Sequence, residues 1–350
     1  MVQSWPKSKE EWREAQAAKV AAAQEILARS VASLQSGKDW QRWLVWQSKF
    51  HTYSPRNVML ISEQAMVRGF EPSYCAGYNT WKALGRSVNK GETGLAVLAP
   101  MPGKLRVAVS GDGAERVLRR DEAPEVGENV RESVQLHGFR IEHTFDVSQT
   151  SGDPIPTPPE PKLLEGEAPA RLGEAVTRLI ESKGYTVDTA PNAAALDGAN
   201  GAIFYTRRQV LVRADMDEAA RVKSLIHEAG HAILHGGPPG MFLPRPRKEV
   251  EAESVAFVVA HAHGMPTDDY SFPYVAGWAG EAKDPALEVA ATQDRVAQAA
   301  REILEASPAD HATGGKVPGV EAALERRRGQ REGTQTIEHE VVGPTGLEVR

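Results

Sequence analysis

Apolar residues recur at helical spacing in the first part of the chain and in strand-like segments further on, which predicts helices and then strands. Three segments have apolar residues at helical spacing: residues 8–35, 38–49 and 55–67. Three later segments are typical of strands: residues 96–99, 105–109 and 139–145. The pattern therefore predicts an α+β domain over residues 1–151, in which residues 8–35 form a helical lead-in.

A proline-rich segment interrupts this pattern at residues 152–168. Five of its residues are prolines, and proline has no backbone N–H and a fixed φ, so neither a helix nor a central strand can form there. We expect an extended linker and place a domain boundary in it. A second domain follows over residues 169–306, and residues 307–350 are charged, poorly patterned and predicted to be a disordered tail.

The second domain is predicted to be mostly helical with a small β-sheet. Its apolar pattern indicates a hairpin and several helices, the hairpin strands being residues 202–205 and 209–213. A strand beside a cleft can pair with an extended peptide, whereas an ordinary structural role for this hairpin is equally open.

The strongest chemical motif lies in the helix that follows the hairpin, where residues 227–231 read His-Glu-Ala-Gly-His. Two histidines four residues apart project from one face of a helix, close enough to share a metal ion. His227 and His231 are therefore candidate ligands and Glu228 is the candidate general base. The same short motif also arises by chance in unrelated helices, so a third ligand is needed to support this interpretation.

That ligand is expected from a second helix, which begins after Pro246 and carries Glu249, Glu251 and Glu253. Residues two apart on a helix point in nearly opposite directions, so these three carboxylates cannot all face the metal. We choose Glu253 as the third ligand and expect Glu251 nearer solvent. Glu249 is either an outer acceptor of a histidine N–H or a solvated carboxylate at the helix start.

Two imidazoles and a carboxylate would leave Zn²⁺ an open position for water, whose pKa falls to about 7 on binding. Glu228 would take the proton of that water and deliver it to a leaving amine, which predicts peptide hydrolysis. Mn²⁺ or another divalent ion could occupy the same ligands. Tyr270 is either an oxyanion donor or a ring in the core.

Composition bears on compartment and partners. The chain has 350 residues, 41% of them hydrophobic, and one cysteine, Cys75, which fits a reducing compartment. It has no secretory pattern and no apolar run long enough for a membrane span, so we expect a cytoplasmic protein without a membrane partner. Residues 38–110 carry ten basic and four acidic residues, although the whole chain has a net charge of −6. A basic segment on an acidic protein favours an anionic partner.

The basic segment is also rich in aromatic residues, which favours single-stranded DNA, because bases stack on exposed rings within a cationic groove. A core role is the alternative for each ring. The candidate DNA-binding residues are two rings with adjacent polar and basic side chains: Tyr53, Trp81, Arg56, Asn57, Arg86 and Lys90.

The order of these motifs resembles a known family. The HEAGHAILH helix and the following E-x-x-x-F helix resemble the zinc-peptidase domain of the IrrE/ImmA group and of ArdC-type antirestriction proteins. Residues 50–100 resemble the ArdC-type N-terminal domain, which in that family binds single-stranded DNA. The resemblance implies a role in protecting incoming plasmid or phage DNA from restriction.

Three hypotheses follow. The first is a zinc metalloprotease that cuts a protein near DNA, and the second is a DNA-binding antirestriction protein whose metal site is structural or vestigial. The third is an IrrE-like regulatory protease that cleaves a repressor and binds DNA weakly. The sequence identifies neither the peptide substrate nor the oligomeric state.

Overall fold

The computed structural model divides into two compact units. One comprises Met1–Ile26 and Ala96–His143, and the other comprises Leu27–Leu95 and Thr144–Arg350. Within the chain, the structure describes these residues: 9–119, 121–155, 166–268, 270, 272–273, 279, 282–308, 317, 320, 323 and 325. The proline-rich segment lies partly outside this set, and the predicted tail almost entirely so.

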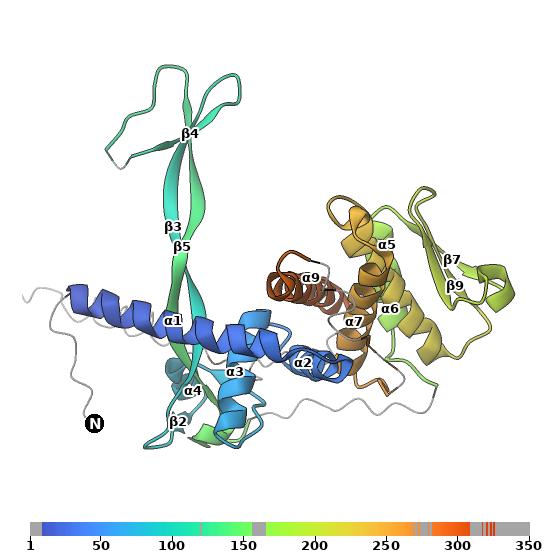
Figure 1. The fold of residues 1–350 in the computed structure, drawn as a ribbon, viewed down its shortest axis with the longest axis horizontal. Coiled ribbons are helices and arrows are strands. Elements are labelled where there is room, and N and C mark those ends of the chain that lie inside the picture. The colour runs from blue at the N-terminus through green and yellow to red at the C-terminus, as the bar shows by residue number, and fades with distance from the viewer. Residues whose placement is uncertain are drawn as a thin grey trace, which may run out of the picture. The chain divides into compact units, whose positions relative to one another are not determined.

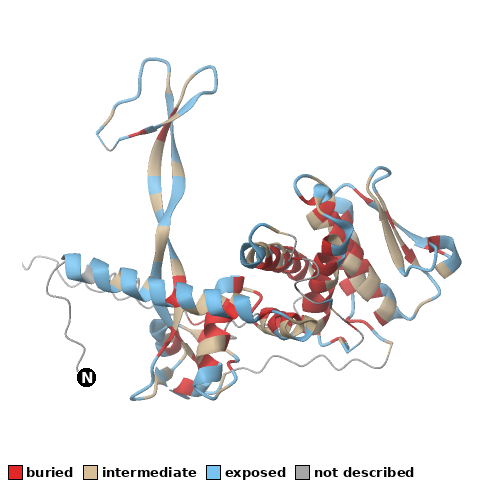
Figure 2. Cartoon of the chain, viewed as in Figure 1, coloured by how far each residue is buried: buried red, intermediate tan, exposed pale blue. Residues whose placement is uncertain are grey.

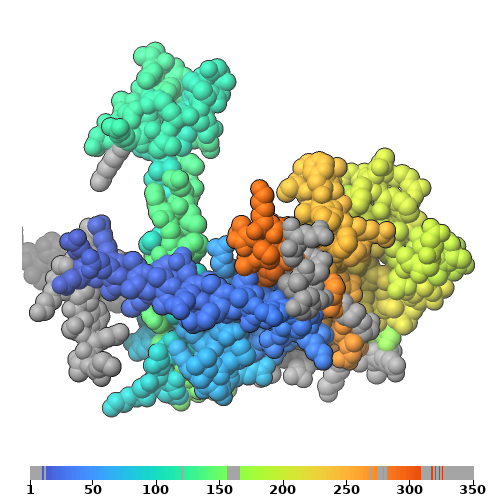
Figure 3. Space-filling model, viewed as in Figure 1, coloured from blue at the N-terminus to red at the C-terminus, as the bar shows by residue number. Residues whose placement is uncertain are grey.

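The first unit contains a long β-ribbon and the beginning of helix α1 (Lys9–Ser33). The ribbon is built from β3 (Leu95–Val109) and β5 (Asn129–Asp146), and the short β4 (Glu115–Leu118) pairs antiparallel with the end of β3. It forms a narrow column with a broader tip (Figures 1 and 3). Ion pairs from Arg116 to surrounding glutamates hold the tip together.

The N-terminal part of the second unit is a small α+β arrangement. Helices α2 (Gly37–Lys49) and α3 (Pro55–Val67) confirm the helices predicted there. Ser36 and Asp39 form a capping box that fixes the start of α2. The remaining short elements are β1 (Cys75–Ala76), α4 (Tyr78–Ala83), β2 (Arg86–Val88), η1 (Val147–Gln149) and β6 (Thr150–Gly152).

The C-terminal part of the second unit is mostly helical, with one small sheet. The sheet has the order β7-β9-β8, in which β7 runs parallel and β8 antiparallel to β9, so β8 is an edge strand. The predicted hairpin is confirmed as β8 and β9. The elements in chain order are α5 (Leu172–Ser182), β7 (Thr186–Ala190), η2 (Ala193–Leu196), β8 (Gly201–Phe204), β9 (Gln209–Arg213), α6 (Glu218–His235), η3 (Gly240–Phe242), α7 (Arg245–Ala262) and α9 (Pro285–Ala306).

Helix α7 lies at the centre of this unit. Figure 2 shows buried residues concentrated along α7 and α9, whereas the ribbon of the other unit is largely exposed. Gly230 lets α6 approach α7 closely, since a Cβ there would lie 3.2 Å from the Cα of Ala252. On another face of α7, the Trp40 indole of α2 donates a 2.8 Å hydrogen bond to Ser254. The fold is therefore α+β, as predicted, with α2 packed directly on a helix of the C-terminal part.

Among the described residues, no helix has the length and apolar character needed to cross a membrane.

Candidate metal centre

Helix α6 brings the two motif histidines together. Its start is fixed by Asp217, whose side chain accepts a 2.7 Å hydrogen bond from the backbone N–H of Ala220. From there the helix runs unbroken to His235. His227 and His231 therefore lie one turn apart on the same face.

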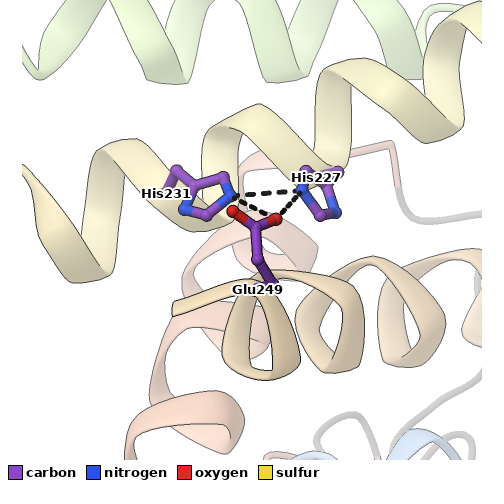
Figure 4. Close-up of side chains that lie close together, drawn as sticks. All are labelled: His227, His231 and Glu249. Atoms are coloured by element: carbon purple, nitrogen blue, oxygen red, sulfur yellow. Dashed lines mark hydrogen bonds and ion pairs between the residues drawn. The ribbon is translucent and has the colours of Figure 1, made fainter. Parts of the chain in front are cut away.

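A carboxylate of α7 meets both imidazoles. The Nε2 atoms of His227 and His231 are 3.2 Å apart, and Oε2 of Glu249 is 3.6 Å from each (Figure 4). Tetrahedral ligands at about 2.0–2.1 Å from Zn²⁺ lie about 3.3–3.4 Å from one another. The three atoms thus have the chemistry and nearly the spacing of a site for one divalent cation.

Glu253 occupies a different position from the one expected. Its Oε2 atom lies 2.9 Å from Nδ1 of His227, on the side of the ring opposite Glu249. This differs from the sequence-based expectation, which made Glu253 the third ligand and Glu249 either an outer acceptor of a histidine N–H or a solvated carboxylate at the helix start. The two residues are one turn apart on the same stripe of α7, and the turn that carries Glu249 is the one that faces both Nε2 atoms.

Glu228 lies on α6, and its side chain is buried against the edge strand β8. Only 5% of its surface is exposed, and burial raises the pKa of its carboxyl to about 7. A Cβ on Gly201 of β8 would lie 2.8 Å from its Oε1 atom. The absence of a side chain at Gly201 therefore allows β8 to lie directly against this carboxylate.

The three clustered groups perturb one another's protonation. Hydrogen bonds to His227 and His231 hold the pKa of Glu249 far below its usual value. Burial alone would lower the pKa of His227, but its contacts with Glu249 and Glu253 outweigh burial and raise it to about 10. Burial lowers the pKa of His231. The carboxylates of Glu249 and Glu253 thus create a negative potential at His227, which favours a bound cation.

These residues open onto a cleft of about 860 Å³. Its walls include the edge of β8 from Gly201 to Ile203, and two basic residues of α7, Arg245 and Lys248. Tyr270 also lines the cleft, and its ring packs edge-on against Phe257 at 5.5 Å. The structure thus places Tyr270 at the site while also giving its ring a packing role.

One further polar residue of the site lies elsewhere than the sequence predicted. Glu251, which we expected nearer solvent, is fully buried, and its Oε2 atom lies 3.1 Å from Nε2 of His235. Arg247 and Arg295 contact its other oxygen at 3.3 and 2.7 Å, which compensates the buried charge. Arg295 lies 44 residues away on α9, so no local pattern could have indicated this partner.

The two aromatic residues expected to stack on DNA bases differ in burial, since Trp81 is buried and Tyr53 is half-buried. Trp81 is completely buried, and its indole donates a 2.9 Å hydrogen bond to the carbonyl of Phe145. Tyr53 donates to the carbonyl of Cys75 at 2.8 Å, and burial raises its pKa to about 12. Trp81 presents no face for stacking in this structure, which corrects that part of the expectation, whereas Tyr53 is half-buried.

The polar DNA candidates divide into two groups. Arg86 is held by backbone carbonyls of Thr150 and Asp153 and so has a structural role. The side chain of Arg56 is half exposed, 3.7 Å from Asp294, and Lys90 is exposed. Asn57 is half-buried. Tyr78, which is not among the predicted DNA-binding residues, is an exposed ring, with 55% of its surface accessible.

Two family models match separate parts of the chain. Residues 20–136 match the N-terminal domain of the anti-restriction factor ArdC, and residues 187–272 match the IrrE N-terminal-like domain of a peptidase family. The second match extends from β7 through α7 and includes every residue of the histidine and glutamate cluster.

Individual relatives are distant. An uncharacterized protein of Bacillus anthracis is 27% identical over 261 residues, which are 68% of this chain and 43% of that protein. The chain thus spans less than half the length of this relative. Crystal structures of the antirestriction ArdC protein from the R388 plasmid are also similar. The metal-free form is 20% identical, with a TM-score of 0.43 over 73% of this chain and 86% of that one. The Mn(II)-bound form is 17% identical, with a TM-score of 0.43 over 81% and 97%.

Proposed function

We propose, from the premise that this chain is an ArdC-type protein with an ArdC N-terminal domain followed by an IrrE N-terminal-like domain, that it binds single-stranded DNA and has a divalent-metal peptidase site. The proposed ligands are His227, His231 and Glu249. The DNA-binding part corresponds to residues 1–151 and the peptidase part to residues 169–306. The single, buried cysteine and the nucleic-acid partner favour a cytoplasmic setting.

The observation that carries the peptidase proposal is the convergence of one atom from each ligand residue. All three lie within 4.8 Å of one another, and the buried Glu228 follows His227 directly in the chain. Zn²⁺ is the ion that this mixture of imidazole and carboxylate suits best, and Mn²⁺ can use the same ligands.

A divalent ion held here would supply Lewis acidity that polarises a carbonyl and makes water more acidic. Glu228 accepts the proton of the attacking water and passes it to the departing amine nitrogen. Glu253 accepts the Nδ1–H of His227, which would leave Nε2 of that ring to bind the ion. Tyr270 lines the cleft, where its phenol can donate to the developing oxyanion.

The edge of β8 provides the substrate track in this proposal. Its outer backbone groups border the cleft, and an extended peptide can pair with them as an additional strand. Because a Cβ on Gly201 would lie only 2.8 Å from Oε1 of Glu228, a peptide paired with β8 would pass beside the general base.

The test compares the Glu228→Gln variant with the unchanged protein. Both are loaded with Zn²⁺ and incubated with a peptide library, and cleavage products are identified by mass spectrometry. We expect equal zinc content and loss of cleavage in the variant. Cleavage by Glu228→Gln at the original rate would refute the mechanism.

A second candidate function uses the DNA-binding part alone, with the metal cluster in a structural role. The match of residues 20–136 to the ArdC domain favours it. Under this candidate, Glu228→Gln leaves protection of incoming DNA against restriction intact. An IrrE-like regulatory protease, favoured by the match of residues 187–272, would instead cleave a repressor and bind single strands weakly.

A further inference from the structure

Behind His231 lies a buried chain of polar groups that the proposed mechanism does not use. Nδ1 of His231 is 3.0 Å from Nδ1 of His235, and Nε2 of His235 is 3.1 Å from Oε2 of Glu251. His235 is 1% exposed and Glu251 is 0% exposed. These groups are shielded from water, so their hydrogen bonds must be satisfied by one another.

Glu251 is fixed as an acceptor. Its Oε1 atom receives the Nε of Arg295 at 3.0 Å, the Nη2 of Arg295 at 2.7 Å and the Nε of Arg247 at 3.3 Å. Both guanidinium groups also contact Glu288. Two arginines and two glutamates balance in charge, so the network is neutral without protonation of His235.

The direction of each hydrogen bond then follows. Since Glu251 accepts, the Nε2 of His235 must carry the hydrogen, and a neutral imidazole has its lone pair on the other nitrogen. Nδ1 of His235 therefore accepts, which requires the hydrogen of His231 to be on Nδ1. The lone pair of His231 is left on Nε2, the atom that lies 3.6 Å from Glu249.

We infer that His235 and Glu251 are positioning residues that hold His231 in the tautomer and orientation needed to bind a metal ion. They serve His231 as Glu253 serves His227. Arg295 of α9 anchors the carboxylate of Glu251. Helix α9, which carries none of the proposed ligands, therefore also supports His231. The inference rests on the proposed metal site.

The test measures Zn²⁺ affinity by competition with a chelator in two variants of similar size. His235→Leu removes the acceptor of His231, whereas His235→Asn places a carbonyl oxygen at the position of Nδ1. Loss of such an outer partner typically weakens metal affinity by about 10- to 100-fold. We expect that loss in His235→Leu and recovery of most of the affinity in His235→Asn.

A spectroscopic readout separates positioning from packing. Co²⁺ bound to the unchanged protein and to His235→Asn should give the same visible absorption band, and His235→Leu should give a weaker or shifted one. Equal losses of affinity in the two variants, or none in His235→Leu, would overturn the inference and leave the metal site standing. Failure of the unchanged protein to bind Zn²⁺ would overturn the proposed function and this inference together.

Discussion

At the scale of single residues, Gly201 controls how closely the edge strand approaches the proposed general base. A Cβ at this position would lie 2.8 Å from Oε1 and 3.0 Å from Cγ of Glu228. Glu228 is buried and lies on a rigid helix, so it has little room to move away. The position of its carboxylate is therefore determined partly by a residue that has no side chain.

The Gly201→Val substitution should displace the Glu228 carboxylate without touching the metal ligands. We expect peptide cleavage to fall by about 100-fold, the size of effect that a small misplacement near the reacting groups can produce. Zinc content should be unchanged, because His227, His231 and Glu249 keep their positions. Cleavage at the original rate would show that β8 does not constrain Glu228.

The buried state of Trp81 changes which residues should be tested for DNA binding. Arg56 and Lys90 remain available to bind phosphates because both are exposed. Replacing both with Ala should weaken binding to single-stranded oligonucleotides. The slope of log affinity against log salt should become shallower by about 0.7 for each phosphate that the variant no longer neutralises.

Trp81→Ala serves as the contrasting variant. Removing a buried Trp typically costs about 3–5 kcal/mol of stability, so its effect should appear as a lower unfolding temperature. If it abolished binding at full stability while the Arg56 and Lys90 variant bound normally, the ring would be a DNA contact after all.

At the scale of elements, the site depends on how closely α6 and α7 cross. Gly230 lies within the histidine motif and faces Ala252, with Val255 also in contact range. The residues that face each other at the crossing are small, which brings Glu249 of α7 to within 3.6 Å of the histidines of α6. The helix contact and the ligand geometry therefore have the same cause.

Gly230→Val should push α6 and α7 apart, which would disrupt both the helix contact and the geometry of the proposed ligands. Overpacking a core contact typically costs about 1–3 kcal/mol, which denaturant unfolding would measure. Zn²⁺ affinity should fall more steeply than in a variant that is destabilised to the same degree elsewhere, such as Ala300→Val on α9. Parallel losses in the two variants would argue against a specific role for the crossing.

The elements that could be predicted from the sequence are those with a local cause. The capped α6 and the β8–β9 hairpin follow from apolar spacing and turn positions, and both are observed. β7, with the sequence Thr-Val-Asp-Thr-Ala, has too weak an apolar alternation to be recognised. The exposed ribbon strands extend beyond the predicted segments because they have no buried face along much of their length.

The proposed metal site likewise combines residues whose positions have a local cause with residues placed by tertiary packing. The helical spacing of His227 and His231 is a local property, and so the sequence specified it. The choice between Glu249 and Glu253 depends on which turn of α7 crosses α6. That choice is set by tertiary packing, as is the pairing of Glu251 with Arg295.

At the scale of the whole chain, α2 and α3 belong to the same compact unit as α7 and α9. Trp40 of α2 bonds to Ser254 of α7, and Arg301 of α9 donates to the backbone carbonyls of His51 and Tyr53 at 3.0 Å. The compact units thus cut across the boundaries proposed from the proline-rich segment. Helix α7 carries the proposed ligand Glu249 and also the contact to α2.

A fragment containing only residues 169–308 should therefore be markedly less stable than the complete chain. Without α2, the face of α7 that carries Ser254 and His261 loses its cover. We expect a lower unfolding temperature and aggregation, which calorimetry and light scattering would measure. A fragment that unfolds at the same temperature as the whole protein would show that the peptidase part is independent.

The most direct test of the account is the zinc affinity of the Glu249→Ala and Glu253→Ala variants, measured side by side against a chelator. We predict one Zn²⁺ per chain in the unchanged protein, near-complete loss of binding in Glu249→Ala, and a loss of only about 10- to 100-fold in Glu253→Ala. Tight binding by Glu249→Ala together with loss in Glu253→Ala would contradict it.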